Sequence, residues 1–184
     1  MEYPVRTRTS IYNAEVKSWD VIVVGGGIIG LSLSIALRKG GAKVLVVERG
    51  EPGREASYAA GGMLADCAME TPADLQPLAT ASARMYPEFV HELELESGTK
   101  VDLRDEGAIV FDPQQLGDGS SRLATSLPAP LTELEPGLAD PNRPAIFLRE
   151  RSVDPRALTA AALCTAKKRG VDFSSGDTVT QIDV

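Results

Sequence analysis

The segment between residues 20 and 50, DVIVVGGGIIGLSLSIALRKGGAKVLVVERG, constrains the fold of this chain more than any other feature. Its run Val21 to Val24 is unbroken and β-branched, which is typical of a parallel strand covered on both faces. An apolar helix follows a glycine turn, and Gly40 and Gly41 supply the left-handed residue that ends helices. Lys43 to Glu48 then predicts a second buried strand. One stripe of the expected helix holds Ile28, Leu31, Ile35 and Lys39.

These elements predict a βαβ unit, in which the crossover between parallel strands is right-handed in nearly all proteins. We therefore predict an α/β protein with a Rossmann-like, FAD/NAD(P)-binding fold built on a parallel sheet. The chain has 184 residues, enough for one domain or for parts of two.

The turn between the first strand and the helix reads G-x-G-x-x-G, the dinucleotide-binding fingerprint. We expect Gly25 to permit the tight turn, Gly27 to let the backbone approach a diphosphate, and Gly30 to let the helix pack closely on the strand. The free N–H groups of the first helical turn, which begins with Ile28 and Ile29, would stabilise the diphosphate without a lysine. The alternative is that the glycines serve only close packing.

An acidic residue, Glu48, ends the second strand at the place where a carboxylate accepts hydrogen bonds from ribose hydroxyls. A carboxylate there also repels a 2′-phosphate, which argues against NADP. Arg49 beside it weakens that inference, because an arginine at this place can accommodate a 2′-phosphate. Glu48 could instead be a solvated acid at the end of a strand.

The segment 53–66, GREASYAAGGMLAD, is rich in small residues and shows neither helical nor strand periodicity. Such a run lets main-chain N–H groups approach a flat ring and a diphosphate. Together with the glycine fingerprint, it resembles the N-terminal part of the D-amino-acid oxidase superfamily of FAD-dependent oxidoreductases, and most closely the glycine oxidases of thiamine biosynthesis. The similarity continues more loosely through DLRDEGAIVF, LTELEPGL and VDPRALTAAL.

The resemblance implies FAD as the cofactor and several further contacts with it. In that family the segment after the ribose-binding acid passes the diphosphate and the flavin ring, while a later position meets the adenine. The residues so implied are Ala56, Ser57, Gly61, Gly62, Met63 and, on the adenine side, Val179. Ser57 has an alternative interpretation as the N-cap of a helix in its own segment.

The resemblance also implies oxidative deamination of glycine, a small D-amino acid or another amine. Hydride would pass to the flavin, and oxygen would then be reduced to hydrogen peroxide. Because the cofactor carries this chemistry, we nominate no catalytic residue and no metal ligand. Two alternatives stay open: a non-catalytic FAD-binding module or subunit that needs a partner chain, and, less favoured, an NAD-dependent dehydrogenase.

We divide the chain into four parts by composition and pattern. Residues 1–17 are expected to be a flexible extension, 18–98 the first part of an FAD-binding domain, 99–150 part of an antiparallel substrate-binding region, and 151–184 the second part of the FAD-binding domain. The C-terminal half of the family fold is expected to be absent, because family members are about twice as long.

Local signals predict four further elements. A helix with Leu78, Ala81, Met85, Phe89 and Leu93 on one face runs to Gly98, and Pro87 bends or splits it. A hairpin joins residues 101–104 to 108–111. Asp154 and Pro155 begin a helix that ends before Gly170, with Lys167, Lys168 and Arg169 complementing its negative end. Residues 178–184 alternate like a strand. The inward face of the later helix should hold Leu158, Ala161, Ala162 and Thr165.

Charge and composition exclude several other classes. The net charge of −7 and a pI near 4.8 disfavour a nucleic-acid partner. Cys67 and Cys164 lie far apart and His91 is the only histidine, so neither zinc nor a disulfide framework is expected, and the reducing cytosol is the expected compartment. The longest apolar run, Val21 to Leu31, is shorter than the about 20 residues of a membrane helix. A small-molecule substrate is the expected partner, and association into a homo-oligomer stays open.

Overall fold

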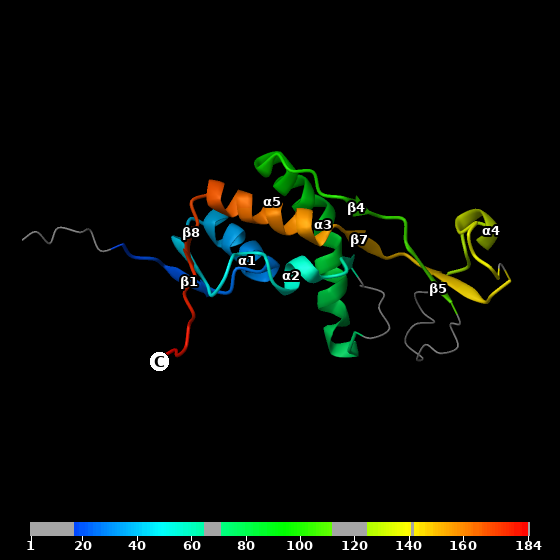
Figure 1. Cartoon of the computed structure of the whole chain (residues 1–184), viewed down its shortest axis with the longest axis horizontal. Coiled ribbons are helices and arrows are strands. Elements are labelled where there is room, and N and C mark those ends of the chain that lie inside the picture. Colours follow the sequence, from blue (N-terminus) through cyan, green and yellow to red (C-terminus); the bar gives the residue numbers. More distant parts are fainter. Residues whose placement is uncertain (1–16, 65–70, 112–124, 141, 184) are drawn as a thin grey trace, which may run out of the picture.

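The computed structural model describes residues 17–64, 71–111, 125–140 and 142–183. In chain order the elements are β1 (Val21–Val24), α1 (Ile28–Lys39), β2 (Val44–Glu48), α2 (Ala56–Ala59), β3 (Met63–Leu64), η1 (Ala73–Leu75), α3 (Gln76–Ser97), β4 (Leu103–Arg104), β5 (Ala108–Phe111), α4 (Leu131–Leu134), β6 (Ala145–Leu148), β7 (Arg151–Val153), α5 (Pro155–Lys168) and β8 (Asp172–Ser175). Figure 1 shows β1, β2 and β8 at one end and β5, β6 and α4 at the other, with α3 between them.

The βαβ unit forms as predicted, and β8 adds a third strand to it. All three strands are parallel in the order β1-β2-β8, with Val23 opposite Val46 and Val46 opposite Phe173. α1 and α5 lie side by side over this sheet (Figure 1), and the core between them is apolar. The predicted Rossmann-like α/β class is confirmed.

The position of the third strand differs from the prediction. β8 spans residues 172–175, whereas residues 177–183 form no regular secondary structure, so the predicted strand over 178–184 is wrong. The chain leaves the sheet at Gly176, whose φ is +87°. The N–H groups of Gly176 and Asp177 both donate to the carbonyl oxygen of Glu48, at 2.8 and 3.1 Å, which turns the backbone away from β2.

The two faces of the parallel sheet differ in burial. Val23 and Val46 are buried against the helices, whereas Ile22 and Val24, which point to the opposite face, are 59% and 57% exposed. The prediction that β1 is covered on both faces is therefore wrong for the described part of the chain, in which only one face carries helices.

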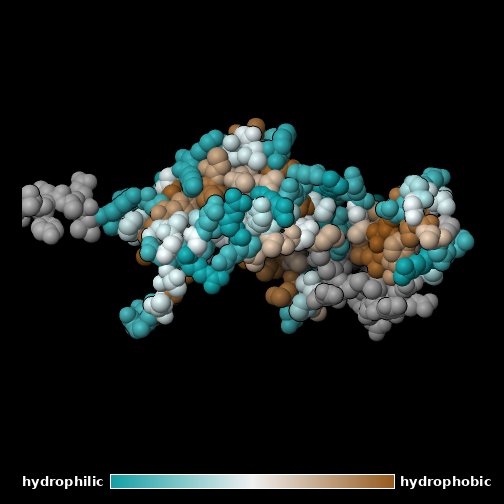
Figure 2. Space-filling model, in the orientation of Figure 1, coloured by the Kyte–Doolittle hydropathy of each residue, from teal (hydrophilic) through white to brown (hydrophobic). Residues whose placement is uncertain are grey.

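The antiparallel strands form a long ribbon and not the predicted hairpin. β4 pairs with β7 and β5 pairs with β6, while β4 and β5 do not pair with each other. The register continues from the β4–β7 pair into the β5–β6 pair. Leu103 lies opposite Val153, and five residues later Ala108 lies opposite Leu148. Gly107 allows the connection, because a Cβ there would lie 2.1 Å from the ring of Phe147. Apolar side chains gather over β5 and β6 (Figure 2).

Helix α3 continues through Pro87 as one element, so of the two predicted effects of this proline, a bend or a split, the split is wrong. Leu93 is buried as predicted, but Leu78 and Met85 are each 68% exposed. Helix α5 follows the prediction closely: Asp154 Oδ1 accepts hydrogen bonds from the N–H groups of Arg156 and Ala157 at 2.8 and 3.2 Å. Its predicted inward residues, Leu158, Ala161, Ala162 and Thr165, are all buried.

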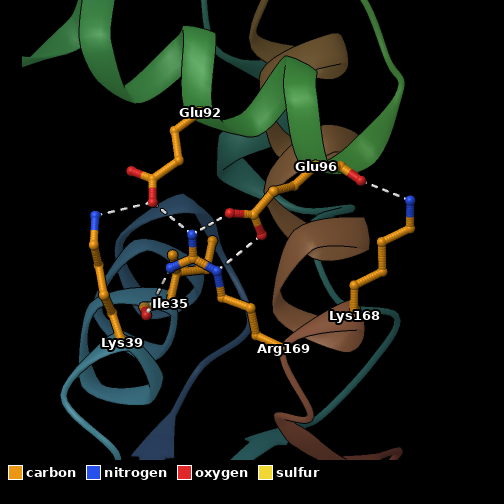
Figure 3. A network of polar contacts seen from close by, with 6 residues as sticks. All are labelled: Ile35, Lys39, Glu92, Glu96, Lys168 and Arg169. Atoms are coloured by element: carbon orange, nitrogen blue, oxygen red, sulfur yellow. Dashed lines mark hydrogen bonds and ion pairs between the residues drawn. The ribbon is translucent and has the colours of Figure 1, made fainter.

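A charged network joins the three long helices, with Arg169 at its centre (Figure 3). Its guanidinium donates to Glu92 Oε1 at 2.5 Å, to both carboxylate oxygens of Glu96, and to the carbonyl oxygen of Ile35 at 3.3 Å. Lys39 adds a 3.0 Å contact to Glu92 Oε1. The side chain of Arg169 is only 16% exposed, so it bridges α1, α3 and the end of α5 and does more than the predicted helix-end complement.

None of the described helices is long and apolar enough to cross a membrane.

Candidate functional site

The turn after β1 needs glycine at two positions for reasons visible in the backbone. Gly25 has φ of +101°, in the left-handed region, and a Cβ there would meet no atom within 4 Å. A Cβ on Gly30 would lie 2.0 Å from the carbonyl oxygen of Gly25 and 3.2 Å from Val23 Cγ1. These positions agree with the structural part of the prediction: a tight turn at Gly25 and close helix packing at Gly30.

The N-terminus of α1 opens toward this turn without a side-chain cap of its own. Gly27 is the N-cap residue, and the first turn holds no acidic residue. The N–H of Ile28 donates to Ser57 Oγ at 2.9 Å. Ser57 lies inside α2, whose N-cap residue is Glu55, so the alternative in which Ser57 caps its own segment is wrong. Its hydroxyl instead occupies the N-terminus of α1.

Glu48 is the most constrained acid of the site. It is 8% exposed, and its two carboxylate oxygens accept hydrogen bonds from the N–H groups of Gly26 at 2.7 Å and Gly50 at 3.0 Å. These two donors, Gly26 first, hold the pKa of the Glu48 carboxyl below its ordinary value of 4.5. Glu48 is thus an ionised carboxylate in the turn, and the alternative of a solvated acid is wrong. We did not foresee Gly26, although three successive glycines were a signal.

The neighbouring Arg49 points to a second acid. Its Nε donates to Glu55 Oε1 at 3.0 Å and its Nη2 to Glu55 Oε2 at 2.5 Å, a two-bond fork. Both side chains are more than half exposed. Sequence reasoning missed Glu55, because nothing in the spacing of these residues indicates the pair.

The small-residue segment leads from the turn to the antiparallel ribbon. Gly62 has φ of +77°, and a Cβ there would lie 2.0 Å from the carbonyl oxygen of Val153. Glycine is therefore needed at this position by the backbone conformation and by the close approach of Val153. Gly61 faces open space. Met63 begins β3, pairs with Ser152 and is 57% exposed. Ala56 is exposed at the start of α2.

A hollow of about 560 Å³ brings much of the predicted site together. Its lining includes β1, Leu33 and six residues of the predicted set: Gly25, Gly27, Ile28, Ile29, Gly30 and Ser57. A second hollow of about 470 Å³ lies between α1 and α3. Burial raises the pKa of Tyr86, which lines it. Val179 lies outside both hollows, 38% exposed beyond the end of β8.

The geometry of the turn fits the diphosphate of a dinucleotide. The N-terminus of a helix carries N–H groups and an effective positive charge, and here the first turn holds no acid and the side chain at the N–H of Ile28 is the small hydroxyl of Ser57. The carboxylate of Glu48 stands at the end of the adjacent strand.

Within the described ranges no group of His, Cys, Asp or Glu could hold a metal ion. Cys67 lies outside the described residues, and Cys164 is half-buried.

Comparisons with known proteins point to a single family. A family model described as "DAO: FAD dependent oxidoreductase" matches residues 20–184. A glycine oxidase of Bacillus licheniformis is 41% identical over 96 residues, which cover 50% of this chain and 26% of that protein. The uncharacterized oxidoreductase YurR of Bacillus subtilis is 30% identical over 175 residues, 85% of this chain and 46% of the relative.

Solved structures agree with the sequence comparisons. The crystal structure of glycine oxidase from Geobacillus kaustophilus superposes with a TM-score of 0.75 at 27% identity, covering 86% of this chain and 46% of that one. The chain therefore spans at most about half the length of these relatives.

Proposed function

Because this chain belongs to the DAO family of FAD-dependent oxidoreductases, we propose that it binds FAD and takes part in the oxidation of glycine, a small D-amino acid or a related amine. The names of its relatives support this substrate class, since several of them are glycine oxidases. The same class of partner, a small amino acid or amine, is proposed as the substrate.

The diphosphate of FAD would lie against the N-terminus of α1. There the N–H groups of Ile28 and Ile29 and the helix dipole would stabilise a negative charge, and Gly27 has no side chain to block the approach, although Ser57 Oγ lies 3.0 Å from the position that a Cβ would take. Ser57 Oγ, now 2.9 Å from the N–H of Ile28, stands within reach of the same oxygens. Its hydroxyl can rotate from acceptor to donor, which suits a contact to the diphosphate.

The adenosine half would extend toward Glu48. Each of its carboxylate oxygens accepts one backbone N–H, and each has a second lone pair for a ribose hydroxyl. Because the backbone donors keep this group ionised, it repels a 2′-phosphate. Val179, beyond β8, remains the proposed contact on the adenine side.

The flavin ring would lie along residues 56–63. Ala56, Gly61 and Met63 are exposed there, and small residues allow main-chain N–H groups to approach a flat ring. When bound, FAD would supply the redox chemistry, namely acceptance of hydride from the carbon that bears the amine and transfer of the two electrons to oxygen to give hydrogen peroxide, while water would hydrolyse the imine product. This chain's residues bind and orient, and none is nominated as catalytic.

One observation carries this proposal: the turn at Gly25–Gly30, the hydroxyl of Ser57 and the carboxylate of Glu48 meet at the carboxyl end of the parallel strands. Titration with FAD, followed by flavin fluorescence, tests it directly. We expect saturable binding to the purified chain, together with peroxide release when glycine, sarcosine or D-alanine is added. Gly27→Val, checked for folding by circular dichroism, is the control that should abolish binding. A wild-type chain that leaves the FAD signal unchanged contradicts the proposal.

A second candidate function is an FAD-binding module that acts only with a partner polypeptide. The observation in its favour is the uncovered apolar face of the sheet, where Ile22 and Val24 are more than half exposed. It predicts FAD binding without peroxide release from the isolated chain. The two candidates therefore differ in the turnover assay and agree in the binding assay.

A further inference from the structure

The position of Arg49 poses a question of cofactor choice. It follows Glu48 at the carboxyl end of β2, where an arginine can bind the 2′-phosphate of an adenosine ribose. Glu48 and Arg49 therefore have opposite effects on the binding of a 2′-phosphate, because the carboxylate of Glu48 repels it. Which effect prevails depends on where the guanidinium of Arg49 is held.

The guanidinium is engaged by Glu55 through two parallel hydrogen bonds of 3.0 and 2.5 Å. Such a fork satisfies the planar geometry of both groups and fixes the direction of the arginine. Glu55 is also the N-cap residue of α2, the helix that carries Ser57. A 2′-phosphate at this place would have to displace one carboxylate, Glu55, while lying near another, Glu48.

We propose that Glu55 is a specificity-determining residue, which holds Arg49 in the fork seen here and so makes the site select adenine dinucleotides without a 2′-phosphate. This inference rests on the proposed function, because it requires that an ADP moiety binds at the glycine turn. It assigns the choice to a residue that contacts no cofactor and acts through Arg49.

The test measures binding of ADP-ribose and of 2′-phospho-ADP-ribose by isothermal titration calorimetry, with no dependence on turnover. The wild-type chain should bind ADP-ribose more tightly. Glu55→Ala should narrow the ratio of the two dissociation constants by about tenfold, the effect of one charge-assisted hydrogen bond gained by the phosphate. In the double variant Glu55→Ala with Arg49→Ala, the ratio of the two dissociation constants should return toward its wild-type value. The guanidinium that Glu55→Ala released is then no longer present to bind the 2′-phosphate.

Glu51→Ala is the matched control. Glu51 pairs with Arg54 at 3.2 Å, and the substitution removes the same charge from a similarly exposed neighbouring pair. It should leave the ratio within about twofold of wild type. Equal effects of the Glu51 and Glu55 variants, or no effect of Glu55→Ala, would overturn the inference while leaving the proposed function intact. A wild-type chain that binds neither ADP-ribose nor FAD would overturn both.

Discussion

The N–H of Gly26 donates to Glu48 Oε2 at 2.7 Å, across a sequence separation of 22 residues. This bond joins the glycine turn after β1 to the acid at the end of β2, so the two halves of the dinucleotide fingerprint are fixed to each other before any ligand binds. Pre-organisation of this kind reduces the entropic cost of binding.

Glu48→Gln should weaken both the fold and nucleotide binding. Both carboxylate oxygens accept N–H groups, and a glutamine offers only one acceptor, so one buried N–H loses its partner. We expect a loss of about 1–3 kcal/mol in the free energy of unfolding, measured by urea denaturation at pH 7. Glu51→Gln, in an exposed pair, should cost less than about 1 kcal/mol.

The same carboxylate predicts a pH dependence. The folded-state pKa of Glu48 lies below its ordinary value of 4.5, so its stabilising contribution is present above pH 4.5 and is lost as the pH falls through the folded pKa. Below pH 4.5 the stability difference between wild type and Glu48→Gln should therefore shrink. A difference that stays constant between pH 7 and pH 3 would contradict this assignment.

Ser57→Ala separates two roles of one hydroxyl. If Ser57 only caps α1, the substitution lowers the free energy of unfolding by about 1 kcal/mol and leaves the FAD affinity unchanged. We expect FAD affinity to fall as well, by about tenfold, because a contact to the charged diphosphate is lost. Titration followed by flavin fluorescence measures the FAD affinity. Ser82→Ala, at an exposed position of α3, is the control.

Local signals made several elements of the fold predictable. The β-branched run at Val21, the left-handed glycine at Gly41 and the capping carboxylate of Asp154 each act within a few residues, so the sequence displays them. Strand pairing is different. Arg104 pairs with Ser152, far along the chain, and the adjacent segment at Ala108 was therefore assigned the wrong partner. The alternation of apolar and polar residues that marks a strand does not show whether the strand pairs with a neighbour in the sequence or with a remote segment.

The site shows the same division between local and remote causes. The backbone at Gly25 and Gly30 was predictable from the fingerprint, whereas the contact of Glu48 with Gly26 depends on how two turns far apart in the sequence meet in space. The network around Arg169 was missed for this reason, since its carboxylate partners lie on α3. From the sequence alone, a basic residue that complements the end of its own helix cannot be told from one that forms ion pairs with a second helix.

Neighbouring glycines in the flavin segment provide an internal comparison. Gly62→Ala should cost more than about 2 kcal/mol in stability, because it strains a φ of +77° and places a Cβ 2.0 Å from the carbonyl oxygen of Val153. Gly61→Ala meets open space and should change stability by less than about 0.5 kcal/mol. Any loss of FAD affinity in Gly61→Ala then reports on approach of the ring, and a large loss of stability in that variant would contradict this account.

Arg169→Met should loosen the contact between α3 and the parallel-sheet unit. The substitution keeps an apolar stem but leaves Glu92 and Glu96 without their shared cation, so we expect a loss of about 2–4 kcal/mol in urea denaturation at pH 7. Hydrogen bonds from Arg169 are the first cause that lowers the pKa of both carboxyls below 4.5. Wild-type stability should therefore fall as the pH drops below 4.5, and the variant should lose less over the same interval, because Glu96 has lost its hydrogen-bonded cation and Glu92 keeps only Lys39. Lys168→Met removes an exposed donor to the carbonyl oxygens of Glu96 and Ser97 and should cost less than about 1 kcal/mol. Equal losses in the two variants would show that Arg169 does not bridge the helices.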